Sequence, residues 1–247
     1  MTRSSPHKDR QALLIAHYER LTCDMRQSRK LPDLYKIEEI VCRKQVQVVR
    51  ISAKVQEWEQ AAQEKYGKQC LFQQYKSVIE DSVRLQLLPK LAEHYGSAIR
   101  YWHFFEPHEK EGEIKAFTVK GFQEPIFKMR GDVAAREEER LGKIVSRKIR
   151  DAYGRGPNRL ALTQLSEKCL VLEMEGLLGS FSAQYLERHE ALGNALPDLF
   201  SALAHHVLQE LCEEEWQQEL QSFTAVDYKE NRIVTLAVRQ DAVTRCG

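Results

Sequence analysis

The stretch KQVQVVRISAKV, residues Lys44–Val55, has a counterpart in EKCLVLEMEGLL, residues Glu167–Leu178. Alternate residues of a β-strand lie on the same face of a sheet. The two stretches align at a constant separation of 123 positions, the offset between residues 44 and 167. The matched pairs on one face are Gln47 and Leu170, Val49 and Leu172, Ile51 and Met174, Ala53 and Gly176, and Val55 and Leu178. The pattern predicts one strand that occurs twice.

The segments around these stretches follow in the same order in both halves. Before each stretch we expect an amphipathic helix, from apolar residues at helical spacing: Leu14, Tyr18, Leu21 and Met25, or Leu141, Ile144, Val145, Ile149 and Tyr153. Each helix leads into a proline-containing strand, LPDLYKI (Leu31–Ile37) or GPNRLAL (Gly156–Leu162). After each stretch we expect a longer helix, carrying Phe72, Tyr75, Ile79, Val83, Leu87 and Leu91, or Leu196, Leu199, Phe200, Leu203, Val207 and Leu211. Each half closes with two short strands around a polar turn, IRYWHFF with EIKAFTV and SFTAV with RIVTLAV.

Each half therefore reads helix, strand, strand, helix, strand, strand. This order predicts an α+β fold of two tandem copies, each with helices on one face of a small antiparallel sheet. We expect an N-terminal copy over residues 9–120, a linker over 121–135 and a C-terminal copy over 136–247. The expected linker contains two glycines and a proline, residues typical of connections. The alternative is two unrelated segments that share a common pattern.

Composition excludes several classes of protein. The formal net charge of +1 provides no global field that would recruit nucleic acid or an anionic membrane. No apolar run approaches the roughly 20 residues of a membrane-spanning helix, and the amino end, MTRSSPHKDRQ, lacks the apolar core of a secretory signal. The six cysteines occur singly, with no CxxC pair, which indicates thiols in a reducing cytosol. We therefore expect a cytoplasmic protein that does not insert into a membrane.

The corner AYGRGPNRLALTQL, residues Ala152–Leu165, joins the second-half helix to its strand. A helix ending at Tyr153 leaves carbonyls unpaired, and Gly154 can take the left-handed conformation that caps them. Pro157 cannot continue the helix, and Arg155 offers its positive charge to the helix end. This reading needs no ligand. The alternative is that Gly154, Arg155 and Gly156 capture an anion or a carboxylate.

These segments carry a resemblance to a known family. The second half, roughly Glu138–Val238, resembles the MpsC-like family of small bacterial proteins, a domain of unknown function, through YGRGPNRLAL, CLVLEMEGLLG and YKENRIVTLAV. The first half resembles it only in pattern and through its likeness to the second. The family is associated with a membrane-potential-generating, inorganic-carbon uptake system. The resemblance implies a cytosolic accessory or regulator of a membrane transporter and not a translocating subunit.

The chain departs from the family at polar positions. Members typically have a threonine after the strand-two leucine and a glutamate three positions later, where this chain has Gly179 and Ser182. The basic residue usual in the following helix is missing from Leu199–Leu203. If those residues serve a site in relatives, the resemblance implies that this chain has lost it. Such a loss favours a scaffold or assembly role.

Side chains that could carry a reaction are few. His205 and His206 are adjacent, so on a helix they point about 100 degrees apart and do not easily share a metal. No nucleophile elbow, phosphate loop or dinucleotide fingerprint occurs. The residues near a hairpin turn that could hold zinc, instead of being simply solvated, are His103, Glu106, His108 and Glu109. We expect no catalytic residue, no metal and no cofactor.

The sequence favours a non-enzymatic interaction, assembly or regulatory module. Its partner would be another protein, in a membrane-associated complex, or a second copy in a homodimer, which two tandem copies can themselves mimic. Trp216 and His206 are the expected partner contacts, with burial of Trp216 against the sheet as the alternative. The basic helix residues Lys143, Arg147 and Arg150 indicate a solvated face, with phosphate contact as the alternative. The second hypothesis is a small-molecule sensor that binds an anion, bicarbonate or a nucleotide, between the halves through the glycine corner.

Overall fold

The computed structural model of the chain describes residues 16, 36–54, 84–85, 88–105, 113–125, 133–166, 169–179 and 190–239. Its contacts divide the chain into two compact units, Met1–Lys128 and Met129–Gly247, here called the N-terminal and the C-terminal unit. The division falls within the segment 121–135 that the sequence indicates as a linker. β-structure reaches Phe122 on one side of that segment, and a helix begins at Val133 on the other.

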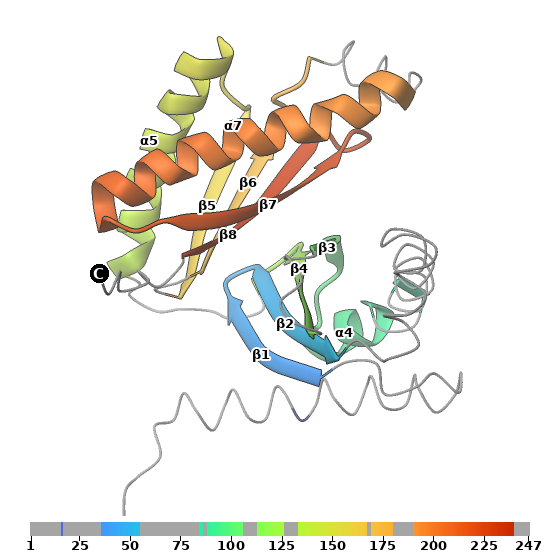
Figure 1. Cartoon of the computed structure of the whole chain (residues 1–247). Helices are drawn as coiled ribbons and strands as arrows, with labels where there is room; N and C mark the ends of the chain where they lie inside the picture. Colours follow the sequence, from blue (N-terminus) through green and yellow to red (C-terminus); the bar gives the residue numbers. More distant parts are fainter. Residues whose placement is uncertain are drawn as a thin grey trace, which may run out of the picture. The chain divides into compact units, whose positions relative to one another are not determined.

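The N-terminal unit is built on a four-stranded antiparallel sheet (Figure 1). The strands lie in the order β1-β2-β4-β3, so the central pair joins segments distant in sequence. A two-residue turn at Lys44 and Gln45 places Arg43 opposite Val46 and joins β1 to β2. The described elements are β1 (Lys36–Arg43), β2 (Val46–Lys54), α4 (Leu88–Tyr95), β3 (Ile99–Phe105) and β4 (Glu113–Phe122).

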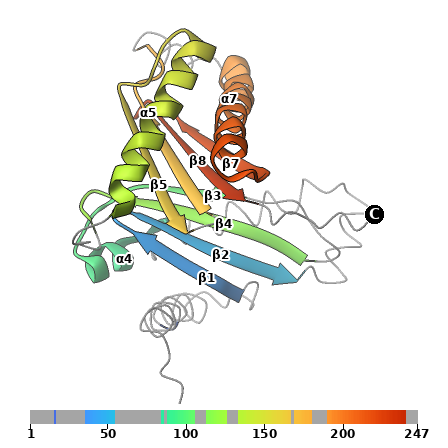
Figure 2. The ribbon, with the colours of Figure 1, turned by 90° about the vertical axis from the view of Figure 1, so that its left-hand side faces the viewer.

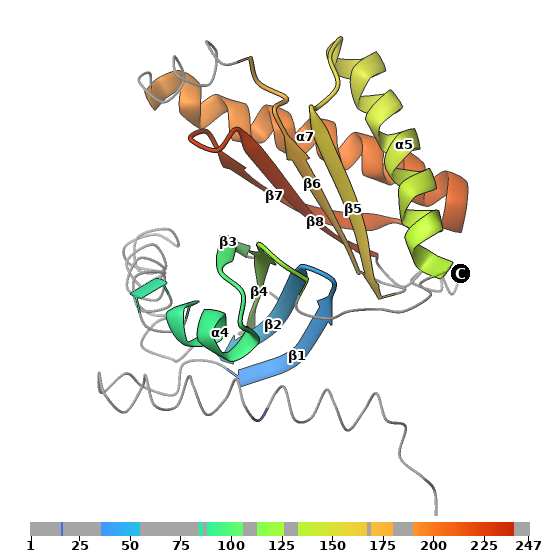
Figure 3. The same cartoon turned by 180° about the vertical axis from the view of Figure 1, so that it is seen from behind.

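The C-terminal unit has the same sheet plan, in the order β5-β6-β8-β7. The two helices described in this unit lie on one face of the sheet (Figure 2), and Figure 3 shows β5 and β7 at its two edges. The elements are α5 (Val133–Tyr153), β5 (Arg159–Ser166), β6 (Cys169–Glu175), α7 (Glu190–Trp216), β7 (Leu220–Asp227) and β8 (Arg232–Arg239). None of the helices in the described ranges is long and apolar enough to cross a membrane.

The predicted α+β fold of two similar copies is confirmed. β2 begins at Val46 and β6 at Cys169, which preserves the separation of 123 positions read from the sequence. The second helices end alike: Gly96 follows α4 with a φ of +61°, and Gln217 follows α7 with a φ of +53°. A left-handed residue at this point turns the chain out of the helix and into the next strand.

The strand that enters each first hairpin lies further along the chain than predicted. β5 spans Arg159–Ser166 and not 156–162, since Pro157 has no N–H to donate to a ladder. β1 extends to Arg43, well beyond Ile37, because the two-residue turn pairs the residues directly before it. The predicted first helix of the N-terminal copy, Leu14 to Met25, lies outside the described residues except for residue 16. Most of its predicted second helix, from Phe72 to Leu87, also lies outside them.

The predicted core stripe of α7 needs one correction. Leu199 is 55% exposed, because it lies about 100 degrees around the helix from Phe200, which is buried. The α7 residues that are buried in the core are Phe200, Ala204, Val207, Leu208, Leu211 and Cys212. They pack with Leu141, Val145 and Ile149 of α5 and with Leu170, Leu172 and Met174 of β6. The stripe predicted for α5 is confirmed in these three residues, whereas Tyr153 is 38% exposed.

Side chains from the helices reach both edge strands of the C-terminal sheet. The buried carboxylate of Glu138 accepts a hydrogen bond from the Gln164 N–H of β5, at 2.8 Å. Gln209 Oε1 of α7 accepts one from the Leu220 N–H, at 3.0 Å, where β7 begins. These contacts satisfy edge groups that the ladder leaves open.

One end of this sheet is closed by Asn231, in the turn between β7 and β8. Its side chain accepts a hydrogen bond from the Leu178 N–H at 3.1 Å and donates one to the Leu178 carbonyl at 2.6 Å. Its own carbonyl oxygen accepts from the Gly176 N–H at 2.9 Å. Gly176 has a φ of +72°, which glycine adopts readily. This glycine and Asn231 together direct the chain away from β6.

Replacing Gly176 by alanine should destabilise the C-terminal unit more than the same change at Gly154. Both glycines have positive φ, and alanine there costs about 1–2 kcal/mol. A Cβ at Gly176 would also lie 2.8 Å from the Cβ of Asn158, whereas one at Gly154 would meet nothing within 4 Å. Urea unfolding followed by hydrogen exchange on β6 measures the difference. Equal losses for Gly176→Ala and Gly154→Ala would contradict the packing argument.

Candidate functional site

The glycine corner is a helix cap. α5 ends at Tyr153, and Gly154 follows with a φ of +76°. The Gly154 N–H donates to the carbonyl oxygen of Arg150 at 2.8 Å, which closes the last turn of the helix. This amide is therefore already engaged, and an anion at the corner would have to rely on other donors.

Arg155 does not make the contact with the helix end that the sequence suggests. Its side chain is exposed and, within the described residues, forms no hydrogen bond or ion pair. Arg150 is instead the basic residue in the last turn of α5. A Cβ at Gly156 would lie 3.5 Å from Arg150 Nε, so Gly156 runs beside that guanidinium. The left-handed Gly154 turns the chain away from the helix axis, which leaves Arg155 on the outside.

The two predicted partner-contact residues lie apart on α7. Ten residues separate His206 from Trp216, which corresponds to about 15 Å along a helix. The His206 side chain is 67% exposed, and its Nε2 lies 3.2 Å from Glu210 Oε1. Trp216 is half-buried, and the guanidinium carbon of Arg239 lies 3.5 Å from its ring centroid. The structure thus leaves His206 at the surface and uses Trp216 for packing within the unit.

His205, next to His206, and the buried Cys212 both have contacts within the C-terminal unit. His205 Nδ1 lies 2.9 Å from Ser222 Oγ on β7, so His205 and His206 point to different partners. Cys212 is buried in the core, and burial raises the pKa of its thiol. A thiol in this state packs as a small apolar group.

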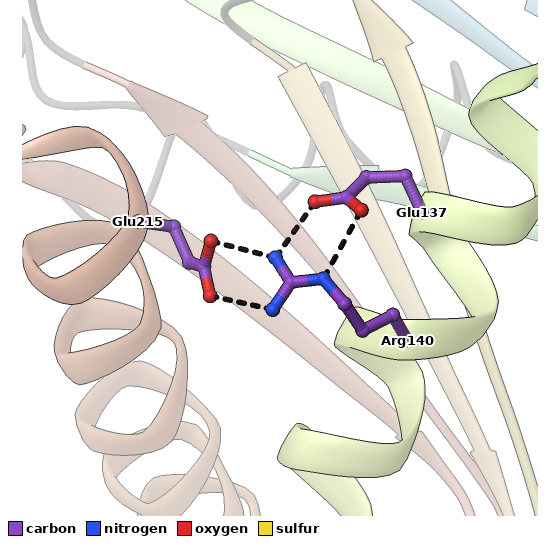
Figure 4. Close-up of polar contacts among 3 residues, drawn as sticks. All are labelled: Glu137, Arg140 and Glu215. Carbon is purple, nitrogen blue, oxygen red and sulfur yellow. Dashed lines mark hydrogen bonds and ion pairs between the residues drawn. The ribbon is translucent and has the colours of Figure 1, made fainter.

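Ion pairs connect the two helices of the C-terminal unit. Arg140 of α5 donates to Glu137 on its own helix and, through two nitrogens, to Glu215 of α7, at distances of 2.6 to 3.1 Å (Figure 4). The hydrogen bonds that Arg140 donates to Glu137 and Glu215 raise its pKa. A two-pronged guanidinium–carboxylate contact fixes orientation as well as charge. This network aligns the start of α5 with the end of α7.

A second ion-pair group lies further along α5. Lys148 Nζ is 2.8 Å from Glu210 Oε2 and 2.9 Å from Glu214 Oε1, and these hydrogen bonds raise the pKa of Lys148. Lys143 pairs with Glu139 on its own helix, at 2.8 Å. Arg140 and Lys148 of α5 therefore neutralise part of the acidic end of α7.

Exposed apolar side chains occur where α5 ends, at the other end of the helix from the Arg140 ion pairs. Tyr153, the last residue of α5, is 38% exposed, and its ring lies 5.9 Å from the ring of Phe200 on α7. Leu199, which precedes Phe200, is 55% exposed. Three exposed arginines lie in the last two turns of α5 or directly after it. We call the set Tyr153, Leu199, Arg147, Arg150 and Arg155 the basic-apolar end.

A different group of polar residues crosses the sheet of the N-terminal unit. Strand register places Cys42 opposite Gln47, Gln47 opposite Lys120 and Lys120 opposite Trp102. Directly opposite residues of antiparallel strands share a face. Cys42, Gln47, Lys120 and Trp102 therefore form one transverse line over four strands, which we call the polar row.

The polar row lies on the face that carries α4. Gln47 Nε2 donates to the Tyr95 hydroxyl of α4 at 2.9 Å and contacts Cys42 Sγ at 3.3 Å. Lys120 Nζ donates to Thr118 Oγ1 at 2.9 Å. Gln47 and Lys120 are both 0% exposed.

Two buried atoms of the polar row lack a hydrogen bond. Gln47 Oε1 is an acceptor without a donor, and Trp102 Nε1 is a donor without an acceptor. A buried polar atom left unsatisfied costs about 1–3 kcal/mol. Native proteins contain few such atoms, and each calls for an explanation.

The C-terminal unit has aliphatic residues at the places of Gln47 and Lys120. There Leu170 pairs with Ala237, and Ala237 pairs with Ser222. Leu170 and Ala237 are fully buried in the apolar core. The fold therefore does not require Gln47 and Lys120, since its other copy is built with aliphatic residues at both places.

Burial determines the protonation of Lys120. Loss of hydration lowers its pKa from 10.5 to about 7, against a smaller opposing effect of Cys42. An ammonium group is costly to remove from water, so the neutral amine is favoured inside the sheet. The neutral amine of Lys120 is therefore well populated near neutral pH.

Sequence reasoning did not identify the polar row as a site. Its signal was present in the repeat, because Gln47 was aligned with Leu170 although one is polar and the other apolar. Lys120 could not be paired with Ala237 from the sequence, since that match requires the register of β4 and β8. Strand pairing then brings Trp102 to the same line.

The described residues contain no group of three or more His, Cys, Asp or Glu placed to hold a metal. Of the hairpin residues considered for zinc, His103 lies on β3, with its ring 5.5 Å from that of Tyr101. Glu106, His108 and Glu109 lie outside the described residues.

Comparisons with known proteins identify no relative: no family model, no curated protein and no solved structure matches the chain.

The stability of the N-terminal unit should rise with pH above neutrality because of Lys120. Between pH 7 and 10.5 the unfolded chain holds a proton on this amine that the folded chain has lost. The free energy of unfolding then increases by up to about 1.4 kcal/mol per pH unit, whereas below pH 7 both states are protonated and this contribution is flat.

The measurement is urea unfolding of the full chain and of Lys120→Met over this pH range, followed by hydrogen exchange on β4 peptides. The free energy of unfolding of Lys120→Met should exceed that of the wild type, and this difference should shrink as the pH rises. The same pH slope in both proteins would show that Lys120 is not the titrating group.

Proposed function

We propose that the chain is a non-enzymatic protein-interaction and assembly module. The observation that carries the proposal is the basic-apolar end. The ring of exposed Tyr153 lies 5.9 Å from that of Phe200, the neighbour of exposed Leu199, and the last turns of α5 carry exposed arginines. Large exposed apolar side chains rimmed by charge are typical of protein-binding surfaces. Tyrosine and arginine are also enriched where binding energy concentrates.

The positive charge of this surface indicates a partner with negative charge. Arg147, Arg150 and Arg155 are exposed there, whereas the acidic end of α7 is neutralised in part by Arg140 and Lys148. A segment that carries carboxylates around one or two apolar side chains would complement it. Such complementarity speeds association and selects the partner.

The setting follows from the resemblance of the C-terminal half to the MpsC-like family. It supports a cytosolic role as an accessory or regulator of a membrane complex for inorganic-carbon uptake. The partner would then be an acidic cytosolic segment of that complex. A homodimer is the alternative partner, since the acidic α7 end of a second copy offers carboxylates too.

An anion sensor is the second candidate function, and the free guanidinium of Arg155 favours it. This side chain is exposed and has no hydrogen bond or ion pair within the described part of the chain. The Gly154 amide is engaged by the helix end, so Arg155 would be the main donor to bicarbonate or a nucleotide phosphate.

The interaction proposal predicts that Tyr153→Ser with Leu199→Ser, and separately Arg150→Glu with Arg155→Glu, reduce binding of the partner at least tenfold, or about 1.4 kcal/mol. Affinity purification from native extract, with quantitative mass spectrometry, compares each variant with the wild type. Size-exclusion chromatography with light scattering reports self-association in parallel.

Lys143→Glu is the matched control, because it reverses a charge on the same helix about 10 Å along the axis from Arg150, the nearer of the two mutated arginines. Proteins lost with both variant pairs and kept with the control would be partners of this surface. Loss of self-association in the same pattern would identify a homodimer instead. If every captured protein binds all the variants equally, the surface is not the interface.

The sensor candidate predicts a thermal shift with bicarbonate or a nucleotide that disappears in Arg155→Ala. A ligand at 100 times its dissociation constant stabilises the folded state by about 2.7 kcal/mol. Differential scanning fluorimetry measures the shift, with Lys143→Ala as the control for general charge effects. A shift that persists in Arg155→Ala would rule out this residue as the binding group.

A further inference from the structure

The polar row is the feature that neither the fold nor the interaction surface explains. Gln47 and Lys120 are fully buried, and Gln47 Oε1 and Trp102 Nε1 have no hydrogen-bond partner. The two unsatisfied atoms belong to the two strand neighbours of Lys120, one on each side. The other copy of the fold has Leu170, Ala237 and Ser222 at these places. The C-terminal sheet thus shows which side chains this fold can be built with at these positions.

We propose that the polar row is a binding site for a small aldehyde or ketone, in which Lys120 is the amine that adds reversibly to the carbonyl carbon. The strand register places a residue with a complementary group on each side of Lys120. Trp102 Nε1–H can donate to the carbonyl oxygen. Gln47 Oε1 can accept from the hydroxyl group that the addition creates. A single carbonyl compound would thereby satisfy both unpartnered atoms.

The reaction balances without any further reagent. The lone pair of neutral Lys120 Nζ forms a bond to the carbonyl carbon, and the electron pair of the C=O π bond moves to oxygen. A proton passes from nitrogen to that oxygen and gives a carbinolamine. Loss of the hydroxyl group with one further proton as water leaves an imine. Water reverses both steps, so the ligand is held and released without oxidation or reduction.

Burial prepares Lys120 for this role. An ordinary lysine has fewer than about one in a thousand of its side chains neutral at pH 7. The pKa of Lys120 is lowered to about 7, so a nucleophilic amine is abundant near neutrality. The Thr118 hydroxyl, 2.9 Å from Nζ, orients the amine along its own strand.

A buried water molecule is the simpler occupant, because it too can accept from Trp102 and donate to Gln47. The two occupants differ in one measurable respect. Water leaves the amine unmodified, whereas a carbonyl compound forms a bond that a mild hydride donor makes permanent.

The test is reductive trapping of the folded full chain at pH 7 with acetaldehyde and sodium cyanoborohydride. Peptide mapping by mass spectrometry gives the labelling rate of Lys120 and that of Lys143, whose side chain is 76% exposed. We expect Lys120 to react at least tenfold faster than Lys143 in the native chain. In urea, where the sheet is lost, the two rates should become equal.

Two variants test the flanking groups. Gln47→Leu copies the residue found at Leu170, and Trp102→Phe removes the N–H donor while keeping an aromatic ring on β3. Each should slow the labelling of Lys120 severalfold and leave Lys143 unchanged. Native labelling of Lys120 no faster than that of Lys143 would overturn the proposal and leave water as the occupant. Labelling rates of Lys120 that neither variant changes would overturn the proposal as well, because Gln47 and Trp102 would then not contribute to the reaction.

Discussion

Each unit depends on antiparallel pairing between strands that are distant in sequence. β2 pairs with β4, and β6 with β8, and each of these pairs forms the centre of its sheet. The outer strands are then attached by short hairpins. Closing the intervening chain costs entropy, which only a well-packed sheet face can offset. In the C-terminal unit α5 and α7 provide that packing through Leu141, Val145 and Phe200.

Much of this architecture could be predicted because strands and helices leave periodic patterns. The β3 boundaries, Ile99–Phe105, and the end of α5 at Tyr153 agree with the sequence reading. Register could not be predicted in the same way. The position of β5 depends on the Asn158 N–H reaching the Glu175 carbonyl oxygen, at 2.8 Å, a contact between segments far apart in sequence. Leu199 was misplaced for a related reason, since a stripe of many leucines does not show which of them faces the sheet.

Some of the candidate sites could likewise be predicted from the sequence, and others could not. The glycine corner was visible in the sequence because glycine and proline have local roles. Its Gly154 cap is formed as expected, whereas Arg155 does not make the expected contact with the helix end. The exposure of Leu199 and Tyr153 could not be predicted, because it depends on how the helices pack on the sheet. The polar row required knowledge of pairing, since Lys120 and Trp102 occur in separate strands of ordinary composition. Two copies of one fold therefore offer a comparison that a single copy would not: a polar residue in one can be judged against its aliphatic equivalent in the other.

The side chains that cap the edges of the C-terminal sheet have a wider consequence. An open strand edge is a template onto which a second strand can add, and two units with the same topology in one polypeptide bring suitable strands to high local concentration. Glu138 and Gln209 occupy backbone donors at the two borders, on β5 and at the start of β7. A carboxylate and an amide thereby each remove one backbone donor from the open edges, which leaves less of the template that a strand from another copy could pair with.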